Sequence, residues 1–175
     1  GEHTRDCTIN KVYFPRQDVT STWQIYRNDQ YKFEFSYPPV YTIRIFDKST
    51  VRGSLFTVIL DSTTIGPGEG GYGPLSSISI GVWDNSKQLS LIDWAEDEYN
   101  RSFSNYNGDG FADFENKTLA EHKAISYSWE GLGYGKTVII ENNKVIFLLD
   151  TGGDSKTERV WQDFDDVLST FKFTK

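Results

Sequence analysis

The segment at 105–116, NYNGDGFADFEN, contains the residues whose types and spacing come closest to a known chemistry. Asn105, Asn107 and Asp109 alternate and are followed by a glycine, and Asp113 comes four residues after Asp109. In a calcium loop, oxygen ligands at positions 1, 3, 5 and 9 surround the ion, and a glycine at position 6 permits the sharp turn. The spacing therefore predicts a calcium site formed by Asn105, Asn107, Asp109 and Asp113.

Two departures from the calcium-loop pattern predict that binding is weak. Position 1 is an asparagine, and position 12 is Asn116, where a bidentate glutamate is expected. Glu115 comes one residue too early and would need an altered geometry. With so few carboxylates near the ion, the affinity should lie in the roughly millimolar range of extracellular modules. The alternative interpretation is an ordinary loop rich in Asn, Gly and Asp.

Two glycine-rich segments resemble nucleotide-binding motifs but lack the required context. Gly66, Gly68 and Gly71 match a dinucleotide fingerprint. That motif needs a helix after the glycines, so that the helix N-terminus meets the pyrophosphate, whereas here a strand is predicted to follow. The segment at 131–137, GLGYGKT, resembles a phosphate loop, yet Glu130 occupies the position of the first glycine and a strand follows again. We interpret both segments as loops or turns.

The sequence offers little for catalysis. It has two histidines, His3 and His122, and one cysteine, Cys7. A catalytic triad needs a nucleophile, a base and an orienting carboxylate within reach of one another, and the sequence suggests no such grouping. Ser169 and Lys172 have the spacing of a Ser–Lys pair, but they fall at a predicted helix end, which explains them more simply. We therefore predict no catalytic residues and a non-enzymatic protein.

An alternative hypothesis is an enzyme or small-ligand-binding domain with a pocket beside the loop at 66–73. Tyr72, Trp83 and Trp129 are its candidate lining residues, because aromatic side chains commonly line ligand pockets. Core packing is the competing interpretation of the two tryptophans. Acidic residues on two predicted helices are interpreted as solvated faces or as an acidic docking surface; they are Asp93, Glu96, Asp97, Glu98, Asp163, Asp165 and Asp166.

Apolar residues at helical spacing predict two amphipathic helices. The first begins after Leu89, with Ser90 and Asp93 as an approximate capping box, and the second begins with a capping box at Ser155 and Glu158. The predicted buried stripes are Leu91, Ile92, Ala95, Tyr99 and Phe103 in the first helix, and Val160, Trp161, Phe164, Val167, Leu168 and Phe171 in the second.

Alternating apolar and polar residues predict strands over the rest of the chain. The stretch 23–46 should form two strands separated by Pro38 and Pro39, because proline cannot donate to a ladder. Its Phe33, Phe35, Ile43 and Ile45 are predicted core residues. Further strands are predicted at 55–60, 77–83, 113–118, 123–129, 136–141 and 145–150, with a hairpin turn at Asn142–Asn143. This order predicts an α+β domain on a mostly antiparallel sheet.

Composition excludes several functional classes. The chain has 175 residues, of which 18 are basic and 25 acidic, so the net charge is −7. An acidic chain without a basic run is a poor candidate for nucleic acids or anionic membrane surfaces, since Lys and Arg supply most of that affinity. No apolar run reaches the roughly 18 residues of a membrane helix. The 15% of aromatic residues could fill a core without disulfides.

The N-terminal residues predict a processed protein. Residues 1–22 show little periodicity and are expected to be a partly irregular leader, followed by a single domain at 23–175. Methionine is absent, even at position 1, which predicts processing or trimming. Cys7 is interpreted as a free thiol on a tail or, alternatively, as a lipid-attachment residue or an intermolecular bridge. A removed signal peptide or upstream anchor would explain these features.

A family resemblance appears in the stretch 31–41, YKFEFSYPPVY, preceded by Trp23, Tyr26 and Asn28. This pattern resembles the opening of PsbP-like proteins. The segments LSLIDWAEDEY, KTVIIENNKVIFLL and VLSTFKF follow in matching order, so the resemblance extends over residues 23–173. Where PsbP-like proteins often have a tryptophan shortly after the YP pair, this chain has Tyr41.

The resemblance implies a three-layer α/β/α sandwich on an antiparallel sheet. Proteins of this fold include photosystem II extrinsic subunits, a Ran-binding nuclear import factor and many exported bacterial domains and lipoproteins, so function does not follow from the fold. We expect an exported or cell-surface domain, such as the soluble part of a lipoprotein or membrane-anchored protein, that binds an unidentified protein partner or assists assembly. Two alternative functions remain: a small-ligand or enzymatic domain with a pocket near 66–73, and a weak calcium-binding module at 105–116.

Overall fold

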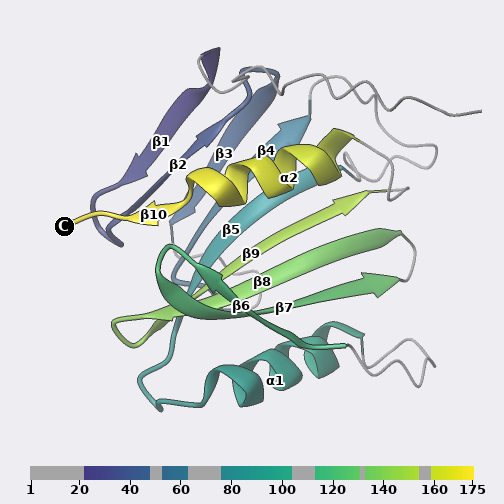
Figure 1. Cartoon of the computed structure of the whole chain (residues 1–175). Coiled ribbons are helices and arrows are strands. Elements are labelled where there is room, and N and C mark those ends of the chain that lie inside the picture. The colour runs from purple at the N-terminus through teal and green to yellow at the C-terminus, as the bar shows by residue number, and fades with distance from the viewer. Residues whose placement is uncertain (1–21, 48–52, 63–75, 104–112, 131–132, 154–158) are drawn as a thin grey trace, which may run out of the picture.

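The computed structural model describes residues 22–47, 53–62, 76–103, 113–130, 133–153 and 159–175. Strands dominate these ranges, and two helices accompany them (Figure 1). In chain order the elements are β1 (Gln24–Asn28), β2 (Phe33–Tyr37), β3 (Tyr41–Asp47), β4 (Phe56–Ser62), β5 (Ser77–Asp84), α1 (Leu91–Phe103), β6 (Glu115–Leu119), β7 (His122–Glu130), β8 (Tyr134–Asn142), β9 (Val145–Gly153), α2 (Arg159–Thr170) and β10 (Lys172–Phe173).

The strands form two antiparallel sheets. A seven-stranded sheet has the order β3-β4-β5-β9-β8-β7-β6, and a three-stranded sheet has the order β1-β2-β10. Every pairing within them is antiparallel. The predicted α+β class and mostly antiparallel sheet are confirmed. The separate small sheet was not predicted: the stretch 23–46 contains three strands, of which the first two pair with each other, and β2 also pairs with the C-terminal β10.

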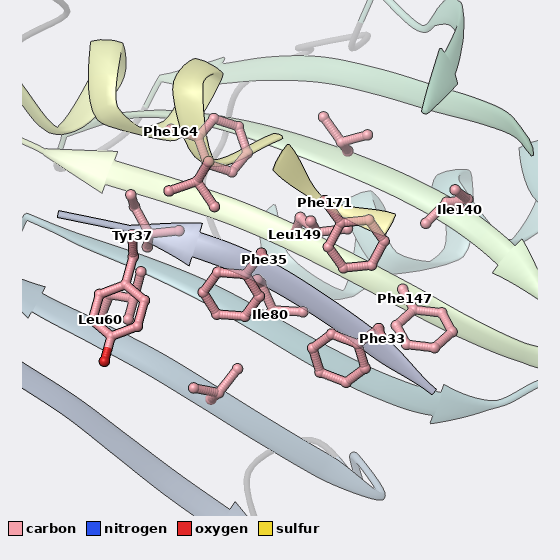
Figure 2. Close-up of a cluster of buried hydrophobic side chains, with 14 of the residues drawn as sticks. Phe33, Phe35, Tyr37, Leu60, Ile80, Ile140, Phe147, Leu149, Phe164 and Phe171 are labelled. Carbon is pink, nitrogen blue, oxygen red and sulfur yellow. The ribbon is translucent and has the colours of Figure 1, made fainter. Parts of the chain in front are cut away.

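The larger core lies between the seven-stranded sheet and a layer formed by α2 and the small sheet. Phe33 and Phe35 of β2 are 0% and 1% exposed. Their rings point toward the large sheet beside Phe171, which follows α2 (Figure 2). Phe33 lies 5.5 Å from the ring of Phe147 on β9 and 5.7 Å from that of Phe171. These ring contacts join residues distant in sequence, and they hold α2 and β2 on the sheet.

A second core lies on the opposite face, beneath α1 (Figure 1). Trp94 and Ala95 of α1 are buried against Ile139 and Leu148 of the sheet. The Trp94 ring meets that of Trp83 edge-on, with centroids 6.0 Å apart. One helix therefore covers each face of the sheet, as the predicted three-layer α/β/α arrangement requires.

Two turns show how the sequence directs the chain. The predicted hairpin turn lies one residue later than expected, at Asn143 and Lys144, whose φ angles are +51° and +65°. Positive φ at both central residues gives the twist that a two-residue hairpin needs. At Pro38 the chain passes from the small sheet to the large one, and the amide of Tyr41 donates to the Pro38 carbonyl at 3.2 Å. The predicted break at the prolines is thus a change of sheet.

Several predicted burial assignments were wrong. Ile45 is 51% exposed and Ile43 only half-buried, because β3 is an edge strand of the large sheet. Ile92 of α1 is 38% exposed, and its predicted place in the core is taken by Trp94. Glu98, expected on a solvated face, is 3% exposed and lies 3.2 Å from the Arg101 guanidinium. The buried face of a helix can thus include a polar side chain such as Glu98.

The aromatic contacts predict a large effect for one core truncation. Phe33→Ala should lower the free energy of unfolding by about 3–5 kcal/mol, since it removes a fully buried ring and leaves a cavity. Ile25→Ala on the adjacent strand is the control: Ile25 is 69% exposed, and its truncation should change stability by less than about 0.5 kcal/mol. Urea unfolding measures both. Equal losses for the two variants would contradict the assigned role of the aromatic core.

Candidate functional site

The described residues of α2 and of the β6–β8 part of the large sheet line a groove of about 770 Å³. This volume is within the usual range of ligand sites. α2 packs on the large sheet against β5 and β9, and Figure 1 shows β6, β7 and most of β8 lying to one side of the helix. The helix therefore forms one wall, and the strands form the floor and the other wall.

The α2 wall follows from helical spacing. Phe164 and Leu168 are four residues apart, as are Asp165 and Ser169, so the two pairs form adjacent rows on one side of the helix. Phe164 is fully buried, Leu168 is half-buried, and the other two are exposed. This wall is consequently apolar near the sheet and polar at the rim.

The strand side of the groove follows from the two-residue period of β7 and β8. Ser126, Ser128 and Glu130 alternate along β7 and line the groove. Ser126 pairs across the ladder with Val138, and Ser128 pairs with Lys136, so these side chains share one face of the sheet. The floor therefore combines hydroxyl groups with one aliphatic and two charged side chains.

Charged side chains connect the two walls. The Lys136 ammonium on β8 lies 3.0 Å from the Asp165 carboxylate on α2, and 4.9 Å from the centroid of the Trp161 ring. On the β6 side, the Lys117 ammonium lies 3.4 Å from Glu115. Because Asp165 is 58% exposed, its ion pair stabilises the fold by at most about 1 kcal/mol. The ion pair is more informative about the site, because it connects β8 and α2, the two sides of the groove.

Hydrogen bonds at both ends fix the position of the α2 wall. Near the N-terminal end, Tyr41 of β3 donates its hydroxyl to the Asp163 carboxylate at 2.9 Å, and the Arg159 guanidinium lies 3.3 Å from the same group. At the C-terminal end, the backbone amide of Ser36 donates to the Thr170 hydroxyl at 2.9 Å. Asp163 is 4% exposed, which corrects its predicted place on a solvated face. Its burial is compensated by these partners.

The Tyr41 phenol titrates unusually as a result. Burial, followed by the nearby Asp163 carboxylate, raises the pKa of Tyr41 far above its ordinary value, and the Arg159 guanidinium offsets a smaller part. The phenol therefore stays protonated in the folded protein and remains a hydrogen-bond donor to Asp163.

The predicted calcium residues fall largely outside the described ranges. Asn105, Asn107 and Asp109 belong to that undescribed part, while Asp113 is exposed and lines the groove. Among the described residues, no group of three or more His, Cys, Asp or Glu side chains could hold a metal ion. The calcium site stays a prediction, which melting curves recorded at several concentrations of calcium can test.

The two predicted ligand-binding tryptophans lie away from the groove. Tyr72 is outside the described residues, as is the loop at 66–73. Trp83 and Trp129 are half-buried and pack against the core beneath α1, on the opposite face of the sheet. A Cβ atom on Gly81 would lie 2.3 Å from the Trp83 ring, and one on Gly135 would lie 2.0 Å from the Trp129 ring. Both rings occupy the space that a side chain at these glycines would need, and the pocket at 66–73 stays a prediction.

The other chemical candidates are engaged in structural contacts. The His122 ring, at the start of β7, meets the Phe173 ring at 4.8 Å. Ser169 donates to the Asp166 carbonyl at 2.6 Å, whereas the Lys172 ammonium lies 2.9 Å from Glu34. The end of the GLGYGKT segment is part of β8, so a strand replaces the helix that a phosphate loop would require.

Sequence reasoning missed the groove because its residues come from four separate elements. A signal was present in β7, where Ser126, Ser128 and Glu130 alternate in a strand that was expected to have a buried face. Polar residues at every second position would fill a covered face poorly. Only the pairing of β7 with β8 and the place of α2 show that this face is open to the groove.

Comparisons with known proteins show the fold. No protein-family model matches the sequence, and a search of curated proteins finds no match. The solved structure of the cyanobacterial PsbP (CyanoP) from Synechocystis sp. PCC 6803 is similar, with a TM-score of 0.61 and 15% identity, over 86% of this chain and 92% of that one. A structure from Bacteroides thetaiotaomicron VPI-5482 has a TM-score of 0.51 at 8% identity, over 87% of this chain and 48% of its own. The chain therefore has a PsbP-like fold, as its sequence pattern predicted.

The anchoring of α2 predicts a pH effect. Above pH about 10, the ordinary pKa of tyrosine, Tyr41 loses its proton in the unfolded chain but keeps it in the folded one. The unfolded state then binds fewer protons, so the free energy of unfolding falls as the pH rises. Tyr41→Phe should lower stability by about 1 kcal/mol at neutral pH and make this decline shallower. Urea unfolding of both proteins between about pH 9 and 11 checks it; parallel declines would contradict the assignment.

Proposed function

We propose that this chain is a non-enzymatic binding or assembly domain that acts outside the cytoplasm and engages a protein partner through the groove between α2 and β6–β8. The observation that carries the proposal is the groove itself. Its lining of charged, hydroxyl and apolar side chains is built on a helix and strands fixed by a packed core, which suits recognition of a partner by a preformed surface.

The groove has features of a binding surface more than of a reaction centre. Its described lining contains serine hydroxyls, carboxylates and two lysines, and both lysines lie beside carboxylates. The one histidine in the described ranges, His122, packs against Phe173. A reaction would need a nucleophile and a base within hydrogen-bond reach, whereas binding needs only the shape and the charges that the groove provides.

The extracytoplasmic part of the proposal rests on the PsbP-like sequence pattern and fold. PsbP-like domains include extrinsic and exported proteins, and the chain has a single cysteine, Cys7, near its N-terminus. We propose lipid attachment at Cys7 as the means of retention at the cell envelope. Within the described residues, no helix is both long and apolar enough to cross a membrane.

This proposal predicts the location of the full-length gene product. In intact cells, the domain should be degraded by added protease, and it should sediment with the membrane fraction. Cys7→Ser should move it to the soluble fraction without lowering its melting temperature, because the part of the core that the structure describes begins at Trp23. Incorporation of labelled fatty acid into the wild type, and not into the variant, provides the chemical readout.

Protection from protease until the cells are broken would contradict export. Membrane association of Cys7→Ser equal to that of the wild type would contradict lipid attachment alone. The assembly role is tested separately by native electrophoresis of gently solubilised cells. We expect the protein at a mass well above the 20.0 kDa of the chain, and migration as a lone monomer would count against a partner.

A further inference from the structure

We infer that the groove between α2 and β6–β8 binds an extended, basic peptide segment of the partner. This inference rests on the proposed binding function and specifies its ligand. Three properties of the described lining support it: the direction of the strands, the excess of carboxylates and the apolar surface of the floor.

The groove suits an extended chain because neighbouring strands of one sheet line it. Residues of β6, β7 and β8 all contribute to the lining. The five residues of β6 correspond to about 17 Å at the usual rise per residue. β6 is also the terminal strand of the seven-stranded sheet, and four of its side chains are exposed. A peptide lying along these strands could place alternate side chains toward the floor.

The charge of the lining favours a cationic ligand. The groove is lined by four carboxylates and only two ammonium groups, which leaves an excess of negative charge. The two ammonium groups, of Lys117 and Lys136, each lie within 3.4 Å of a carboxylate. The whole chain carries a charge of −7, which adds a long-range attraction for a positive partner. The carboxylates are Asp113, Glu115, Glu130 and Asp165.

The carboxylates stand on both sides of the groove. Asp165 belongs to α2, Glu130 lies at the end of β7, and Glu115 begins β6. No three of the described carboxylates are grouped so that they could hold one metal ion, whereas a peptide with spaced lysine or arginine residues can meet several of them. Spacing of the acidic groups along separate elements therefore favours a multivalent segment over a single small ion.

The apolar part of the groove lining matches the aliphatic stems of lysine and arginine side chains. Val138, Leu119 and Leu168 provide apolar surface beneath the charged rim. Lysine and arginine have long aliphatic stems that pack on apolar surface while their charged heads stay at a polar rim. An anionic ligand, such as a phosphate ester or a nucleic acid, would instead place its charge beside the carboxylates.

Direct binding can be measured with the intact chain and a labelled peptide that alternates lysine and valine, followed by fluorescence anisotropy at low and high salt. We expect saturable binding that weakens as the salt concentration rises, because exposed charges are screened. The same peptide with glutamate in place of lysine should not bind. Equal binding of both peptides, or competition by spermidine as strong as by the peptide itself, would overturn the inference.

Three variants and one control locate the site. Asp165→Asn removes a groove carboxylate and should weaken peptide binding about threefold to fivefold, and Lys136→Gln should strengthen it by a similar factor. Ser128→Trp introduces bulk at an exposed groove position and should abolish binding. Asp97→Asn is the matched control: Asp97 is an exposed helix carboxylate paired with a cation, Arg101, on α1 at the opposite face of the sheet. It should leave binding within about twofold.

The outcomes separate this inference from the proposed function. If Asp97→Asn weakens binding as much as Asp165→Asn, the peptide is attracted by general charge and the groove is not its site. If Ser128→Trp keeps its melting temperature and still enters the large native complex, the domain binds a partner through another surface. If the wild type forms no such complex, the proposed binding function itself fails. Both are supported if Asp165→Asn weakens peptide binding, Lys136→Gln strengthens it, and Ser128→Trp abolishes both peptide binding and the complex.

Discussion

The structure depends above all on one set of ring contacts, in which Phe33 and Phe35 of β2 meet Phe147 of the large sheet and Phe171 beyond α2. Neither the three-stranded sheet nor a lone helix could remain in place without burying its apolar face. The aromatic cluster joins both to the seven-stranded sheet at once. Because interiors are closely packed, a cluster of this kind fixes the helix position as well as stabilising the fold.

That helix position creates the groove. α2 is held at its two ends by Tyr41–Asp163 and by Ser36–Thr170. It packs against β5 and β9 and meets β8 through Lys136, while β6 and β7 lie to one side of it (Figure 1). The same helix thus buries Phe164 in the core and presents Asp165 to the groove. A binding surface placed on elements this well supported is preorganised, and ordering it on binding costs little free energy.

Polar residues were harder to place from the sequence than apolar ones. Glu98 and Asp163 look like members of acidic helix faces, yet each is buried beside an arginine three or four residues away, Arg101 and Arg159 respectively. Helical spacing could have suggested those pairs, but burial depends on the layer packed above. Ile45 shows the converse: its alternation is typical of a core strand, and it is exposed because β3 has a neighbour on one side only in its sheet.

The sequence by itself determined the fold class and most of the elements, although it did not separate β1 from β2 or predict β10. Alternating runs, the Pro38–Pro39 break and the turn at Asn143 act over a few residues, so they are readable without distant contacts. The apolar stripe of α2 was readable for the same reason. Only the tertiary structure decided that β2 pairs with β10, which strand lies at each sheet edge, and which polar side chains of α2, β6, β7 and β8 meet. Those outcomes depend on contacts between residues far apart in the chain, such as Lys136 and Asp165, which no local pattern encodes.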